Sequence, residues 1–84
     1  MTFNIIFDNE PIDFLNSLPH NIKKRIFEKI ILSKNSPFSH FVRLSGRTDY
    51  KLRVGDYRVI ADINISSQII AITFIGHRKN VYKR

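Results

Sequence analysis

Residues 49–62, DYKLRVGDYRVIAD, are typical of a β-hairpin. Apolar residues recur with a period of two through Tyr50–Val54 and again through Tyr57–Ile63, which predicts two strands with one buried face each. Gly55-Asp56 stands between them and is a two-residue loop of the Gly-X type. We therefore predict two antiparallel strands that turn at Gly55-Asp56.

This loop also predicts the pairing of the hairpin. Leu52 should face Val59 on the apolar face, and Arg53 should face Arg58 on the other face, which also carries Lys51. Two arginines directly opposed across a hairpin repel each other and lower stability. Because the sequence keeps such a pair, we expect an anion between them.

Positive charge is concentrated in the second half of the chain. The 84 residues carry a formal net charge of +7. Residues 1–42 hold five Lys/Arg and four Asp/Glu, whereas residues 43–84 hold nine and three. This asymmetry favours nucleic acid or another polyanion as the partner, and a basic surface that only aids solubility is the alternative.

Length and composition indicate one small folded domain over residues 1–84. The absence of cysteine excludes a disulfide framework and a thiolate metal site. No apolar run approaches the roughly 20 residues of a membrane-spanning helix, and the N-terminus lacks the pattern of a signal peptide. We therefore expect a cytoplasmic protein that binds no membrane.

The other elements are predicted from apolar spacing and turn residues. They are a strand at residues 2–7, helices at 10–17 and 19–33, a loop at 33–41 and an apolar strand at 68–75. The order β-α-α-β-β-β predicts an α+β fold, a small sheet with two helices packed on one face.

In the second predicted helix the apolar residues share one face, and we interpret them as core-forming. These residues are Ile22, Ile26, Phe27, Ile30 and Ile31.

Three stretches carry a resemblance to a known family: LSG at residues 44–46, YKLRVGDYRVI at 50–60 and IGHRKNVY at 75–82. Together with the element order and length, they resemble toxins of the RelE/ParE superfamily from prokaryotic toxin–antitoxin pairs. The resemblance covers essentially the whole chain. It implies a small, strongly twisted antiparallel sheet with an N-terminal helical hairpin on one face.

The resemblance implies one of two activities. The RelE branch cleaves messenger RNA in the ribosomal A site, and the ParE branch inhibits DNA gyrase. Metal-free cleavage uses the 2′-OH beside the scissile phosphate as nucleophile and needs cationic groups at the phosphoryl oxygens. The basic residues favour the RelE-like activity, an endoribonuclease without metal or cofactor. A ParE-like gyrase inhibitor and an inactive RNA-binding relative are the alternatives.

By motif position the resemblance implies four catalytic residues, and His77 is a fifth candidate because some relatives use a histidine. Arg58 and Arg78 would stabilise the phosphate in the transition state, and Lys51 would ease 2′-OH deprotonation or hold the phosphate. Tyr82 would stack on a base or orient the nucleophile, and His77 suits proton transfer near neutral pH. Each could instead be an ordinary solvated or packing side chain. Further phosphate contacts are expected at Arg53, Arg47, Lys79 and Lys83.

One position departs from the RelE pattern. A second lysine is expected two residues before Lys51, and Asp49 stands there instead. The general base therefore stays open, with His77 and Asp49 as candidates. His20 and His40 have no predicted role, and three scattered histidines do not form a metal site.

Strand alternation creates a conflict at the end of the chain. With Ser66-Ser67 as a two-residue turn, His77 would share the face of Arg58, and Arg78 would lie on the other face. We expect a bend at Gly76 to bring both side chains to one cleft.

The resemblance also implies the partners. They are a RelB-like antitoxin that covers the helices and sheet, the ribosome and messenger RNA.

Overall fold

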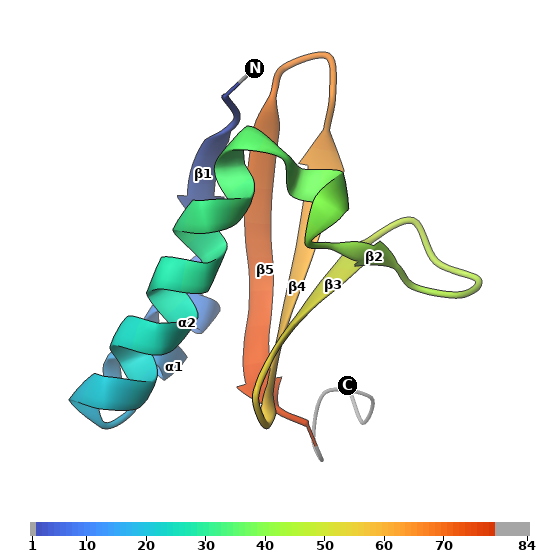
Figure 1. Cartoon of the computed structure of the whole chain (residues 1–84). Coiled ribbons are helices and arrows are strands. Elements are labelled where there is room, and N and C mark those ends of the chain that lie inside the picture. Colours follow the sequence, from blue (N-terminus) through green and yellow to red (C-terminus); the bar gives the residue numbers. More distant parts are fainter. Residues whose placement is uncertain (1, 79–84) are drawn as a thin grey trace.

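The computed structural model describes residues 2–78. The elements in this part of the chain are β1 (Asn4–Phe7), α1 (Asn9–Asn16), α2 (His20–Leu32), the short 3-10 helices η1 (Ser33–Asn35) and η2 (Pro37–Ser39), β2 (Val42–Arg43), β3 (Tyr50–Val54), β4 (Tyr57–Asn64) and β5 (Ile69–His77). The strands form one twisted sheet in the order β1-β5-β4-β3-β2 (Figure 1). The predicted α+β fold is confirmed, with β2 as an additional short edge strand.

The core lies between the helices and one face of the sheet. Leu15 of α1 and Ile26 and Ile30 of α2 pack in one cluster with strand residues such as Val59 and Ile72. All of these side chains are at most 2% exposed. Both helices therefore cover the same face of the sheet, as predicted. Neither of the two described helices is long and apolar enough to span a membrane.

The sheet is mixed, whereas the resemblance implied an antiparallel one. β1 runs parallel to β5, with Asn4 opposite Ile69 and Phe7 opposite Ile72. The other three pairs, β2–β3, β3–β4 and β4–β5, are antiparallel. The alternation within a strand shows which side chains are buried, but it does not show the direction of a neighbour that is distant in sequence.

The β3–β4 hairpin has the predicted register. Leu52 lies opposite Val59, and Arg53 lies opposite Arg58. Leu52 and Val59 are 2% and 0% exposed, so the apolar face of the hairpin is the buried face. Gly55 opens the turn with a φ of +58°, in the left-handed region where a Cβ is strained.

Replacing Gly55 with alanine should destabilise the protein by about 1–2 kcal/mol, because the Cβ would be strained at this positive φ. Urea unfolding of both proteins would measure the loss. Gly55→Asn is the matched control, since asparagine tolerates the left-handed region better, and it should unfold closer to the wild type. An alanine variant as stable as the wild type would contradict the turn geometry.

A β-bulge interrupts the pairing of β4 with β5. Ala61 pairs with Ile72, but Ile60 pairs with Phe74, which leaves Thr73 as an extra residue in β5. The Thr73 hydroxyl donates to the Ile60 carbonyl at 3.3 Å, which holds the bulge in place. After the bulge, each β5 side chain therefore points to the opposite face of the sheet from the one it would take in a strand without the extra residue.

The apolar residues of α2 divide between the core and the surface. Ile26 and Ile30 are buried, whereas Phe27 is 43% exposed and Ile31 is 36% exposed. The prediction that the whole apolar set forms the core is therefore wrong for Phe27 and Ile31. Residues i and i+1 of a helix point about 100° apart, and the sheet covers only one stripe of α2.

Candidate functional site

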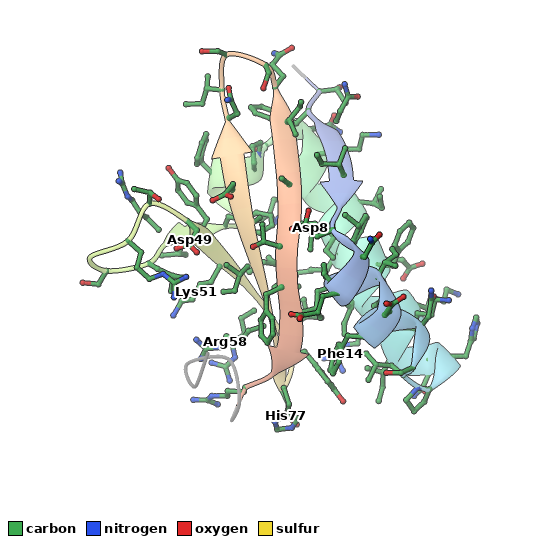
Figure 2. The ribbon with its side chains drawn as sticks, turned by 180° about the vertical axis from the view of Figure 1, so that it is seen from behind. Asp8, Phe14, Asp49, Lys51, Arg58 and His77 are labelled. Carbon is green, nitrogen blue, oxygen red and sulfur yellow. The ribbon has the colours of Figure 1, made fainter. Side chains whose placement is uncertain are left out.

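The face of the sheet turned away from the helices carries basic side chains. Figure 2 shows Lys51 and Arg58 on one side of β5 and Phe14 of α1 on the other side. Strand alternation and the pairing of β3, β4 and β5 place six residues on this surface, which we call the basic face. It comprises Lys51, Arg53, Arg58, Ile60, Phe74 and Gly76.

Arg58 is the most enclosed cation of the basic face. It is only 8% exposed and lies between Arg53 on β3 and Gly76 on β5. Arg53 is exposed, and its Nε donates to the Gly55 carbonyl at 3.4 Å. This hydrogen bond draws the Arg53 side chain toward the turn. Arg53 and Arg58 are therefore paired as predicted. Arg58 is enclosed by the neighbouring strands, whereas Arg53 lies exposed at the edge of the basic face.

The bulge places His77 on the other face of the sheet. Beyond the bulge, Arg58 pairs with Gly76 and Tyr57 pairs with His77. The His77 ring meets the Tyr57 ring edge-on, with centroids 5.4 Å apart, on the side of the sheet that the helices cover. The structure thus does not bring His77 together with Arg58.

The same shift carries Arg78 to the side of Arg58. The Arg78 backbone N–H donates to the Asp56 carbonyl at 2.6 Å, so the ladder continues one residue past β5. Alternation then places the exposed Arg78 side chain on the face of Gly76 and Arg58. We expected a bend at Gly76 to bring His77 and Arg78 to one cleft. The structure has the bulge at Thr73 instead, and Arg78, not His77, shares the face of Arg58.

Asp49 and Arg47 form an ion pair within the loop that connects β2 to β3. An Arg47 guanidinium N–H donates to Asp49 Oδ2 at 2.6 Å, and the Asp49 carbonyl accepts from the Leu44 N–H at 3.1 Å. The Asp49 side chain is 15% exposed, against 54% for Arg47. Residues 43–48 line a shallow hollow of about 540 Å³ beside this pair. The backbone hydrogen bond therefore closes the loop between Leu44 and Asp49, and the carboxylate binds the exposed Arg47 guanidinium.

Three expected contacts, Tyr82, Lys79 and Lys83, lie outside the described residues. Between residues 2 and 78 there is no group of three His, Cys, Asp or Glu side chains that could hold a metal ion.

Phe74 is a feature of the basic face that sequence reasoning missed. It packs against Leu44 and Ile60 in a second, smaller apolar cluster. We predicted residues 68–75 as an apolar strand, without assigning Phe74 to a face of the sheet. The available signal was the break in period between Ile72 and Ile75, two buried residues three positions apart.

A second missed feature is the apolar patch of α2, which consists of Phe27, Ile31 and Leu32. These side chains are 43%, 36% and 61% exposed, and with Glu28 they line a hollow of about 360 Å³. The Phe27 ring stacks on Phe7 of β1 at a centroid distance of 6.3 Å. Exposed apolar patches of this kind are typical of protein-binding surfaces.

Comparison with solved structures confirms the resemblance to RelE toxins. A chain in the archaeal RelE–RelB complex from Pyrococcus horikoshii OT3 is 27% identical, with a TM-score of 0.80 over 93% of this chain and 97% of that chain. A chain in the RelB–RelE antitoxin–toxin complex from Methanococcus jannaschii is 26% identical, with a TM-score of 0.71 over 93% and 95%.

More distant structures share the fold alone. A chain in the intact RelBE toxin–antitoxin complex of E. coli is 19% identical, with a TM-score of 0.75 over 89% of this chain and 95% of that chain. No protein-family model matches the sequence, and no curated protein matches it significantly. The likeness is therefore carried by the three-dimensional structure.

Proposed function

We propose that this RelE-like toxin is a cytoplasmic endoribonuclease that cleaves messenger RNA in the ribosomal A site and so stops translation. The observation that supports this activity is the basic face. Lys51, Arg53 and Arg58 share that face on neighbouring strands, and the bulge adds Arg78 to it. Several cations gathered on one side of a sheet suit a phosphodiester better than a protein interface.

The proposed reaction is an attack of the 2′-oxygen on the neighbouring phosphorus. The new bond between the 2′-oxygen and phosphorus forms as the bond to the 5′-oxygen breaks, which leaves a cyclic phosphate and a 5′-hydroxyl end. The 2′-OH loses its proton to a base, and the departing 5′-oxygen takes up a proton. No metal ion is required for these steps.

Arg58 and Arg78 stabilise the charge on the phosphoryl oxygens. The planar guanidinium fork of arginine binds two phosphate oxygens at once. Arg58 is almost fully enclosed, so its charge is held in a fixed position and in a less polar surrounding than water. The Lys51 ammonium group favours the anionic form of the 2′-oxygen. His77 packs on Tyr57 on the other face, so we assign it no proton transfer.

The activity is tested with ribosomes that hold a defined messenger RNA codon in the A site. Incubation with the toxin should cut the message within that codon, as read by primer extension. A message with a 2′-deoxy nucleotide on the 5′ side of the scissile phosphate should stay intact, since it lacks the nucleophile. Intact normal message together with blocked supercoiling by DNA gyrase would replace this proposal with the gyrase-inhibitor alternative.

We also propose a RelB-like antitoxin as the partner of this toxin. The solved relatives in Pyrococcus horikoshii and Methanococcus jannaschii are complexes of RelE with RelB. On this chain the apolar patch of α2 supplies a docking surface, and α2 carries four basic residues and one acidic residue, Glu28. An apolar patch on a helix with an excess of positive charge fits an acidic amphipathic segment.

A further inference from the structure

The basic face holds one aromatic side chain that the proposed reaction does not use. Phe74 is half-buried and packs against Leu44 and Ile60. The other aromatic residues between residues 2 and 78 lie in or against the core on the helix side, or pack on one of its members. Among the described residues, Phe74 is thus the aromatic ring that shares a surface with the arginines.

Gly76 explains why this ring lies beside Arg58. A Cβ at Gly76 would lie 2.7 Å from Cε2 and 2.8 Å from Cζ of Phe74, so the ring occupies the space directly above the glycine. Gly76 is the residue that pairs with Arg58 across the two strands. The absent side chain therefore lets the ring reach the neighbourhood of the guanidinium.

We propose that Phe74 is a stacking platform for a nucleobase that flanks the scissile phosphate. This inference rests on the proposed function and assigns the substrate contact that orients the RNA. A nucleotide carries its base close to its phosphate, and Arg58 and Phe74 offer one partner for each. Aromatic rings stack on any base, because every base has a π-face, so this contact is tolerant of sequence. Packing on Leu44 and Ile60 holds the ring in place before RNA arrives.

The test is a cycle that removes the ring and the base separately and then together. Phe74→Leu keeps an apolar side chain against Leu44 and Ile60 but removes the ring. It should lower kcat/KM for A-site cleavage roughly 5- to 150-fold, the range for loss of one base–aromatic stack. An abasic nucleotide, placed in turn on each side of the scissile phosphate, should cost the wild type a similar factor at one of the two positions. At that position the abasic nucleotide should lower kcat/KM of Phe74→Leu by less than about twofold, because the ring that would stack on the base is already gone.

Three variants show that the loss follows the ring. Phe74→Tyr keeps a ring and should restore most of the cleavage. Gly76→Ala leaves Phe74 unchanged but places a Cβ where the ring lies, so it should lose cleavage as Phe74→Leu does. Phe38→Leu removes an exposed ring that packs on Tyr50 instead, and it should cleave as the wild type does. Circular dichroism melts confirm that each variant is folded.

Binding to ribosomes that carry a 2′-deoxy message separates this inference from the proposed function. If the wild type cuts no message, the proposed function fails, but the same cycle measured on toxin affinity still tests the platform. The inference is overturned if removing the base lowers cleavage or affinity by the same factor in the wild type and in Phe74→Leu at both positions. Phe74 would then be a packing residue only. Unequal losses at one position support the inference.

Discussion

Replacing Arg58 and Arg78 together with alanine should abolish messenger RNA cleavage while the sheet remains folded. Loss of one preorganised group that stabilises transition-state charge typically costs about 10²–10³-fold in rate, and the double variant loses two. Primer extension on ribosomes with a defined A-site codon would measure the rate. Arg58→Lys keeps the charge but not the fork, and it should cleave at an intermediate rate.

Two controls separate lost chemistry from lost structure. Because Arg58 is only 8% exposed, its removal also leaves space beside Gly76, and urea unfolding should accompany every rate measurement. Lys24→Ala removes an exposed positive charge from α2, which packs on the opposite face of the sheet, and should cleave at the wild-type rate. A folded double variant with full toxicity would show that the arginines are not the site.

Replacing Phe27 and Ile31 together with glutamate should release the toxin from its antitoxin. Truncating a hot-spot residue at the centre of a protein interface costs about 2–4 kcal/mol, and the new carboxylates would also repel an acidic partner. We expect the affinity of the complex to fall at least about 100-fold, as measured by calorimetry. Cells that express this variant with the antitoxin should stop growing.

The matched control for this variant is Ile65→Glu. Ile65 is 66% exposed in the turn between β4 and β5, so the substitution adds the same charge to an apolar surface residue outside the α2 patch. Its complex should keep the wild-type affinity. Unchanged affinity of the Phe27 and Ile31 variant would place the antitoxin on another surface.

Local chemistry was sufficient to predict the central hairpin. The alternation in β3 and β4 and the Gly55-Asp56 turn led to the observed pairing of Arg53 with Arg58. Both signals lie within a few residues of each other, and the turn leaves little freedom in register. The helices were likewise predictable, because apolar spacing and Pro11 near the start of α1 act within one element.

The candidate site was predictable only in part. Lys51, Arg53 and Arg58 follow from the hairpin, but the side of the sheet that Arg78 takes depends on the bulge at Thr73. A single extra residue inverts the faces of everything after it, and its position is set by which isoleucines fill the core. Phe74 was missed for the same reason.

The sequence alone determined the two α-helices, four of the five described strands, the hairpin register and the excess of positive charge on the strand-rich half. The tertiary structure decided the parallel pairing of β1 with β5, the exposure of Phe27 and Ile31, and the separation of His77 from Arg78. Local patterns express the preferences of neighbouring residues. Which strands pair, and which apolar side chains stay exposed at the surface, depends on how segments distant in sequence fill one core.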